Sequence, residues 1–352
     1  MSLDRPLEVG LIGYGLGGAN FHAPWIATTP GMRLAAVMTS SAARADAVRT
    51  RYPGTAVVGT FEELLAIVPA LDLIAISTPN ATHYPLARAV LEAGRHVSVD
   101  KPFAPTAEQA LELEVLAKRM GKSAFPFQNR RWDGDFLTVQ HLLSEGTLGK
   151  IHRFESRFDR WRPTPKAGWC RPDAREAAED ILLDLATHLI DQALVLFGPV
   201  TDVFAEVNRI HPNVVTTDDA FIALTHANGV ISHLYMTSTA GISEPRMSVY
   251  GSSGAYLKSG LDIQEDVLRA GGMPGSPGWG EETEAQWGTL GAGEKIEKVP
   301  TMPGSYAPFY AGVERTIRMG TPPPVSVADV AMGLSIIAAA RRSAAEGRKV
   351  AP

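Results

Sequence analysis

One stretch constrains the fold of this chain more than any other: an apolar segment that runs straight into a glycine-rich turn. Residues 7–12 read as a strand, and the turn after it has the spacing Gly13-x-Gly15-x-x-Gly18 before a segment that can begin a helix. In such a turn, glycines allow a tight bend, close approach of a pyrophosphate, and close packing of the helix on the strand. The motif alone is weak evidence, so its setting decides whether it binds a dinucleotide.

The setting is a series of strands and helices at the spacing of βαβ units. Strands are predicted at 34–39, 71–77, 97–100 and 123–127, and helices at 61–65, 84–93 and 106–120. Gly94 and Gly121 follow two of these helices, where glycine commonly ends a helix. The alternation of strand and helix predicts a doubly wound parallel sheet, and with the glycine turn it predicts a Rossmann dinucleotide-binding domain over residues 1–127.

The end of the second strand indicates which dinucleotide is bound. An NAD site normally has an acidic residue there, roughly 20 residues after the glycines, which accepts the ribose 2′-hydroxyl. This chain instead offers hydroxyls and a cation, Ser40 and Arg44 among them, which suit a 2′-phosphate better. The sequence therefore favours NADP over NAD. The alternative is that Arg44 is an ordinary charge on a helix surface.

Further cofactor contacts are expected from the loops that follow the strands, because open α/β sheets bind ligands at the carboxyl ends of their strands. The candidate cofactor-binding residues are Gly13, Tyr14, Gly15, Gly18, Ser40, Arg44, Thr78, Asn80, His83 and Lys101.

Lys101 is also the first candidate for catalysis. It follows a short apolar strand and Asp100, and it precedes Pro102, which holds the residue before it extended. Its side chain should therefore project from the carboxyl end of the strand, at the edge that carries the glycine turn. A solvated surface charge is the simpler alternative for an isolated Lys-Pro, because most lysines are exposed.

Residues 128–352 have a different pattern, which predicts a second domain of the α+β class. Segments of alternating polar and apolar residues indicate a large, mostly antiparallel open sheet with one face covered. These segments are 151–161, 200–210, 220–225, 230–238 and 247–250, with a hairpin turn at 227–229. Helices are expected at 135–145, 305–319 and 326–346, and a long surface loop at 270–294.

One helix of this domain, over residues 181–197, carries a second set of chemical groups. It is apolar almost all round and should be buried, yet Asp184, His188 and Asp191 fall on one face at i, i+4 and i+7. A histidine that an aspartate orients suits proton transfer near neutral pH. Two alternatives stay open: a satisfied polar seam against the sheet, and a metal site of one histidine and two aspartates. A metal is not predicted, because the same groups serve equally as a base with its orienting partner.

Composition argues against several other classes of protein. The 352 residues suit two domains, the net charge of −5 argues against nucleic-acid binding, and no apolar run of about 18 residues could span a bilayer. The first residues lack the regions of a signal peptide, so the cytoplasm is the expected location. Cys170 is the only cysteine, which rules out an intramolecular disulfide and argues against a thiolate zinc site.

With the glycine turn, Asp100-Lys101-Pro102 and Asp184-x-x-x-His188 in this order, the chain resembles the Gfo/Idh/MocA family of NAD(P)-dependent oxidoreductases over essentially its whole length. The family's usual signatures have glutamate where Asp100 stands and glycine where Ala186 stands. The resemblance implies that Lys101, Asp184 and His188 are the catalytic set. It also implies that the sheet of the second domain mediates homodimers or homotetramers.

Finer features, at 129–133, 158–163 and 184–192, are similar to the branch that contains scyllo-inositol 2-dehydrogenases. The resemblance implies hydride transfer between NAD(P) and a secondary alcohol or ketone of a cyclic polyol or sugar, with His188 as base and Lys101 stabilising the oxygen. Side chains that could hold the substrate are Arg130, Trp132, Asp159, Trp161 and Arg162, each with the alternative of a structural role. A reductase of keto-sugars or anhydro-sugars and a non-catalytic NADP sensor are the alternative functions.

Overall fold

A computed structural model describes residues 5–67 and 71–352, which form two compact units. The first unit comprises Met1–Asn129, Gln264–Trp279 and Ser305–Ala328; the second comprises Arg130–Ile263, Gly280–Gly304 and Asp329–Pro352. This division differs from the single boundary after residue 127, because two later segments return to the first unit. Residues 1–4 of the expected first domain lie outside the described part.

The first unit is built on a parallel sheet of six strands. In chain order these are β1 (Leu7–Ile12), β2 (Met32–Met38), β3 (Ala56–Val58), β4 (Leu73–Ile76), β5 (His96–Val99) and β6 (Ala124–Pro126). The strand order is β3-β2-β1-β4-β5-β6, so the order reverses at β1, where β4 pairs on its other side. The predicted Rossmann fold is confirmed, and the carboxyl end of β1 is the place where such sheets commonly bind ligands.

The strands are connected by short helices, as the alternating pattern predicts. They are η1 (Gly18–His22, π-helical), α1 (Ala23–Thr28), α2 (Ala42–Arg51), α3 (Phe61–Ile67), η2 (Asn80–Thr82), α4 (His83–Glu92) and α5 (Ala107–Arg119). The side chains of Ser41 and Thr106 cap α2 and α5 by accepting backbone N–H groups of the first turn. Gly94 and Gly121 have positive φ just beyond α4 and α5, where the left-handed region ends a helix.

Aromatic packing explains why two later segments belong to the first unit. These segments carry α8 (Gln264–Arg269) and α9 (Ala307–Met319). The ring of Trp25 in α1 lies 5.3 Å from that of Trp279 and 5.6 Å from that of Tyr306. Phe309 in α9 lies 4.8 Å from Phe127. Large rings buried in this way contribute much of a core's stability, so these segments complete the first unit's core.

The second unit is built on a sheet of eight strands. They are β7 (Ile151–Asp159), β8 (Val200–Asn208), β9 (Asp219–His226), β10 (Ile231–Thr237), β11 (Met247–Gly251), β12 (Ala255–Lys258), β13 (Gly288–Ala292) and β14 (Lys295–Val299), in the order β14-β13-β12-β11-β7-β10-β9-β8. Only the β7–β10 pair is parallel among the described pairs, which confirms a mostly antiparallel sheet.

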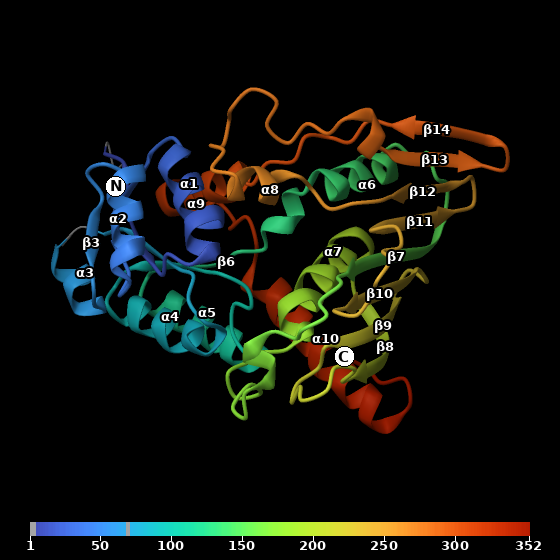
Figure 1. The fold of residues 1–352 in the computed structure, drawn as a ribbon, viewed down its shortest axis with the longest axis horizontal. Helices are drawn as coiled ribbons and strands as arrows, with labels where there is room; N and C mark the ends of the chain where they lie inside the picture. Colours follow the sequence, from blue (N-terminus) through green and yellow to red (C-terminus); the bar gives the residue numbers. More distant parts are fainter. Residues whose placement is uncertain (1–4, 68–70) are drawn as a thin grey trace. The chain divides into compact units, whose positions relative to one another are not determined.

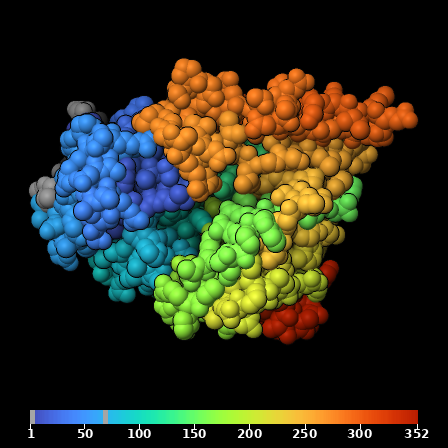
Figure 2. All heavy atoms as spheres, in the orientation of Figure 1, coloured from blue at the N-terminus to red at the C-terminus, as the bar shows by residue number. Residues whose placement is uncertain are grey.

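The prediction of a long surface loop at residues 270–294 is partly wrong. Residues 288–299 form the β13–β14 hairpin, and a short turn, η6 (Glu284–Gln286), precedes it. In the space-filling view the orange hairpin extends as an arm beside β12 (Figure 2). Every residue of β14 but the last is exposed, so the strand shows no buried face.

Helices cover one face of the second sheet. Alternate residues of β7, Phe154, Ser156 and Phe158, are buried on this face, and α7 (Thr187–Phe197) packs against β7 and β10. α10 (Val327–Glu346) joins the same layer, and its Ser343 hydroxyl accepts the backbone N–H of Ala205 in β8 (Figure 1). The remaining elements are η3 (Asn129–Trp132), α6 (Gly134–Ser144), η4 (Ala167–Cys170) and η5 (Leu182–Ala186, π-helical).

Within residues 5–67 and 71–352, every helix is too short or too polar to cross a membrane.

Candidate functional site

The glycine turn after β1 can pack tightly against its own backbone and that of Ser77 only because Gly13 and Gly18 lack side chains. Gly13 has a φ of 95°, and a Cβ built there would lie 2.1 Å from the carbonyl oxygen of Ser77. A Cβ at Gly18 would lie 2.0 Å from the carbonyl oxygen of Gly13, whereas at Gly15 it would meet open space. The turn is therefore tight on its inner side and open on its outer side, as the pyrophosphate of a dinucleotide requires.

The carboxyl end of β2 carries the two side chains predicted to select the cofactor. Ser40 and Arg44 are exposed at this end, one before and one inside the first turn of α2. Ser41 between them caps the helix, because its hydroxyl accepts the backbone N–H of Arg44. Tyr14, by contrast, is buried within the unit, and this burial raises the pKa of its hydroxyl. Ser40 and Arg44 are thus exposed to solvent, while Tyr14 contributes mainly to the core.

The loop after β4 is tied to the end of β5 by a buried histidine. The two ring nitrogens of His83 lie 2.8 Å from the carbonyl oxygens of Thr78 and Pro102. The hydroxyl of Thr78 also lies 2.6 Å from that of Thr82, and Asn80 begins the short η2 turn between them. Since both of its ring nitrogens are engaged, His83 supports these loops and leaves Thr78 and Asn80 as the nearer candidates for ligand contact.

Lys101 follows β5 directly, and its neighbour Asp100 holds its backbone. An Asp100 oxygen accepts the backbone N–H of Lys101 at 2.7 Å, and the other accepts the hydroxyl of Ser77 at 3.0 Å. A Cβ at Gly17 would lie 2.7 Å from this second oxygen, so the glycine turn and Asp100 are in direct contact. Lys101 was predicted to follow a strand whose end lies beside the glycine turn, and the structure has this arrangement.

Asp100 remains a carboxylate over the whole neutral range. Burial by itself raises its pKa, but the polar side chains around it, His22 first and then His83 and Lys101, lower the pKa to about 2. A permanent negative charge thus lies beside the backbone of the candidate catalytic lysine.

In the second unit, Asp184 and Asp191, which were expected to share one face with His188, are each held by a basic side chain. The segment before α7 is the π-helical η5, whose wider turn shifts Asp184 relative to a regular α-helix. Asp184 pairs with Lys166 at 2.5 Å, and Asp191 accepts two hydrogen bonds from Arg131 at 2.7 and 2.9 Å. Asp191 therefore belongs to a structural ion pair, while Asp184 and His188 remain as candidates for chemistry.

His188 lies deep in the second unit, at the start of α7. It is 4% exposed, and its ring centroid lies 6.3 Å from that of Phe158 in β7. The same phenyl ring has guanidinium carbons of Arg246, Arg130 and Arg160 at 4.2, 5.2 and 5.7 Å from its centroid. Three guanidinium groups therefore gather around the phenyl ring that neighbours His188.

Two of these arginines are fixed by buried partners. Arg130 pairs with Asp133 at 3.0 Å, and Arg246 donates to the hydroxyl of Ser156 and to the side-chain oxygen of Gln192. The predicted substrate residue Arg130 is therefore committed at least in part to the fold. Trp132, on the same η3 turn, is partly buried.

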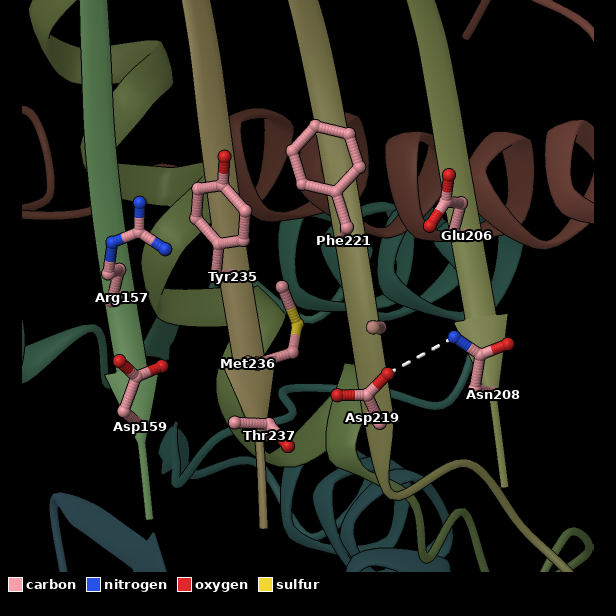
Figure 3. Close-up of a pocket in the computed structure, with 10 residues that line it drawn as sticks. Arg157, Asp159, Glu206, Asn208, Asp219, Phe221, Tyr235, Met236 and Thr237 are labelled. Carbon is pink, nitrogen blue, oxygen red and sulfur yellow. Dashed lines mark hydrogen bonds between the residues drawn. The ribbon is translucent and has the colours of Figure 1, made fainter. Parts of the chain in front are cut away.

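The other three predicted substrate residues lie at or beyond the end of β7. Asp159 accepts the backbone N–H of Glu244 and lines an open hollow of about 460 Å³ on the sheet face opposite His188 (Figure 3). Trp161 is 62% exposed. Arg162 makes its described hydrogen bonds through the backbone, to Ser238 and His211. The structure does not bring Asp159 together with His188, because neighbouring residues of a strand point to opposite faces.

Sequence reasoning missed four residues of these surroundings: Gly17, His22, Lys166 and Arg246. A faint signal existed for two of them. His22 is a titratable residue in the short segment that follows the glycine turn, and Arg246 directly precedes the buried β11. Gly17 and Lys166 gave no signal, because their partners are distant in sequence. Among the described residues, no group of three histidine, cysteine or acidic side chains could hold a metal ion.

Comparison with known proteins covers both units. The family model described as "Oxidoreductase family, NAD-binding Rossmann fold" matches residues 7–127, and the "GFO/IDH/MocA C-terminal domain" model matches residues 136–257. The uncharacterized oxidoreductase YdgJ of Escherichia coli (strain K12) is 39% identical over 94% of this chain and 94% of its own. The scyllo-inositol 2-dehydrogenase (NADP(+)) IolW of Bacillus subtilis (strain 168) is 34% identical over 98% and 95%. The structure of the oxidoreductase yvaA from Bacillus subtilis has a TM-score of 0.90 at 34% identity and covers 99% of each chain.

Proposed function

The chain belongs to the Gfo/Idh/MocA family of NAD-binding oxidoreductases, and on that premise we propose that it transfers a hydride between NADP and a secondary alcohol or ketone of a cyclic polyol or sugar. The observation that carries this proposal is the contact between the glycine turn and Asp100, which puts the backbone of Lys101 beside the expected dinucleotide site.

NADP is the proposed cofactor because of the end of β2. The exposed Ser40 and Arg44 offer a hydroxyl and a cation, and neither could repel a 2′-phosphate as an acidic residue would. The relative IolW, which acts with NADP(+), is consistent with this choice. Gly13, Gly15 and Gly18 would hold the pyrophosphate, with Thr78 and Asn80 near the other end of the cofactor.

The chemistry divides between the cofactor and the side chains. Bound NADP supplies the acceptor or donor of the hydride. His188 takes the proton of the substrate hydroxyl during oxidation and returns it during reduction. Lys101 donates a hydrogen bond to the same oxygen and stabilises the negative charge that develops there. Asp184 forms an ion pair with Lys166, and it orients the substrate or the histidine.

A polyol or sugar is the proposed substrate class because the surroundings of His188 are rich in hydrogen-bond donors. Arginines that already hold buried acids present fixed N–H groups rather than mobile charges, which suits neutral hydroxyls. Scyllo-inositol is the first compound to test, because IolW is named for its oxidation.

One screen tests the proposal. The purified chain is assayed with NADP and with NAD against inositol stereoisomers, aldoses, keto-sugars and anhydro-sugars, in both directions, while cofactor binding is measured separately. We expect turnover of a cyclic polyol or sugar with a higher kcat/KM for NADP than for NAD. Tight cofactor binding without turnover of any compound would overturn the proposal in favour of a non-catalytic NADP sensor.

A further inference from the structure

We propose that His22 and Tyr310 are positioning residues for Lys101, which act through Asp100 in a buried chain of polar contacts beneath the glycine turn. This inference rests on the proposed function, since it assigns a role to residues behind the candidate catalytic lysine.

The chain of contacts joins three distant parts of the first unit. His22 is the last residue of η1, and its Nε2 lies 3.6 Å from Oδ2 of Asp100 at the end of β5. Its Nδ1 lies 2.6 Å from the hydroxyl oxygen of Tyr310 in α9. Both the histidine and the tyrosine are completely buried. A buried polar group is costly unless a partner compensates it. Nδ1 of His22 has the Tyr310 hydroxyl within hydrogen-bond distance, whereas for Nε2 the Asp100 carboxylate lies at ion-pair distance, beyond a direct hydrogen bond.

The chemistry of the partners fixes the direction of these contacts. The Asp100 carboxylate only accepts, so the nitrogen that faces it, Nε2 of His22, must carry a proton. In the neutral imidazole, Nδ1 is then an acceptor, and the Tyr310 hydroxyl donates to it. Burial raises the pKa of Tyr310 well above its ordinary value, so that hydroxyl keeps its proton. The tyrosine thus selects the tautomer that points a donor at Asp100.

Asp100 is held on its remaining side as well, which makes it a rigid support. Ser77 donates to Oδ2, and the absence of a Cβ at Gly17 leaves the space that this oxygen occupies. The other oxygen, Oδ1, accepts the backbone N–H of Lys101. Any rotation of the Asp100 carboxyl would therefore move the point where the Lys101 side chain begins. Misplacement of a catalytic group by about 1 Å can cost about 100-fold in rate, so a fixed origin for this side chain matters to turnover.

Kinetics of four full-length variants test the role. We expect Tyr310→Phe to lower kcat about five-fold, the factor that one neutral hydrogen bond corresponds to. His22→Leu removes the charge-assisted contact and should lower kcat about 10- to 100-fold. His22→Gln can still present an N–H group to Asp100 and should recover kcat to within about three-fold of the parent. In all three, the Kd for NADP and the substrate KM should change less than about two-fold, because both residues are completely buried.

Tyr256→Phe is the matched control. Its hydroxyl is buried in the second unit, and none of the described residues hydrogen-bonds to it, so its removal should leave kcat unchanged. Equal loss of kcat in Tyr256→Phe and Tyr310→Phe would overturn the proposal, as would variants of His22 and Tyr310 with unchanged kcat. Should His22→Leu not fold, Tyr310→Phe and His22→Gln still decide the matter.

A second readout does not depend on activity. Nitrogen-15 NMR of histidine-labelled protein, with the His22 signals assigned by their loss in His22→Gln, reports which ring nitrogen carries a proton. A proton on Nε2 supports the chain of contacts, and its absence from Nε2 overturns the chain. If no substrate is turned over at all, the proposed function fails while this measurement still stands or falls on its own.

Discussion

In the proposed function, Arg44 is the residue that decides between the two nicotinamide cofactors. Its guanidinium is exposed at the start of α2, where a charge-assisted hydrogen bond to a 2′-phosphate is worth roughly 1.5–3 kcal/mol. We therefore expect Arg44→Ala to weaken NADPH binding about 10- to 100-fold and to leave NADH binding within about two-fold, measured by fluorescence titration. An equal loss for both cofactors would show that Arg44 supports the fold of α2 instead.

Asp100 shows how a one-residue departure from a signature is accommodated. The family's usual glutamate would carry its carboxyl one methylene further from the backbone. The shorter aspartate can reach the N–H of the next residue, Lys101, and still contact Ser77. The hydrogen bonds of this carboxyl were invisible in the sequence, because Ser77 and His22 lie 23 and 78 residues away in the chain.

At the scale of single elements, β5 and β6 are joined by a titratable side chain. Nδ1 of His96, the first residue of β5, accepts the backbone N–H of Ser123 just before β6 at 3.0 Å. Burial, aided by the charge of Lys122, lowers the pKa of His96 to about 4. Protonation would destroy the acceptor, so this joint holds only while the ring is neutral.

The pH dependence of stability follows from that shift. Between pH 6.5 and 4 the unfolded chain binds a proton at His96 that the folded chain does not, so stability rises with pH in this window and falls on acidification. We expect His96→Asn, whose side-chain oxygen can still accept the Ser123 N–H but cannot titrate, to flatten the dependence in chemical denaturation at several pH values. An unchanged slope in the variant would assign the dependence to other groups.

The elements that the sequence predicted well are those with a buried face. The strands of the first sheet and α7 are apolar enough to be recognised from periodicity alone. The β13–β14 hairpin was missed because β14 is exposed along nearly its whole length, so no alternation of polar and apolar residues marks it. The π-helical turn η5 was missed because its sequence continues the apolar pattern of the following helix, and only tertiary contacts reveal the wider turn.

The candidate site was predicted unevenly for the same kind of reason. Sequence reasoning identified the residues that belong to a local motif, such as Gly13 and Lys101. Asp191 was placed on one helix face with His188, and the structure shows that it is held by Arg131, which is 60 residues away in the chain. Periodicity places residues on a face of one helix; it does not tell which partner that face meets.

At the scale of the whole molecule, the open face of the second sheet is the surface on which we expect a second copy of this chain. Across four neighbouring strands it presents Arg157, Tyr235, Phe221 and Glu206, with the Tyr235 and Phe221 rings 4.9 Å apart and Arg157 stacked 3.7 Å over Tyr235 (Figure 3). Aromatic and arginine side chains of this kind are enriched in protein interfaces.

A charge placed on this face should break the assembly. We expect the parent chain to be a dimer or tetramer by size-exclusion chromatography with light scattering, and Phe221→Asp to shift it toward the monomer, because a buried unpaired carboxylate is costly at an interface. Met319→Asp, at an exposed apolar residue of the first unit, is the control and should leave the mass unchanged. A monomeric parent chain would contradict the expectation.

The central claim of the proposed function is that Lys101 and His188 act on one and the same substrate hydroxyl. A double-mutant cycle in kcat, on the best substrate of the screen with NADP, tests it most directly. Lys101→Ala and His188→Ala should each lower kcat by about 10²–10⁴, while Lys118→Ala, at an exposed lysine of α5, should not. If both groups serve one proton transfer, the double variant loses no more than about ten-fold beyond the slower single variant. The claim would be contradicted if the loss of kcat in the double variant equalled the product of the two single losses. It would also be contradicted if either single variant kept the kcat of the parent chain.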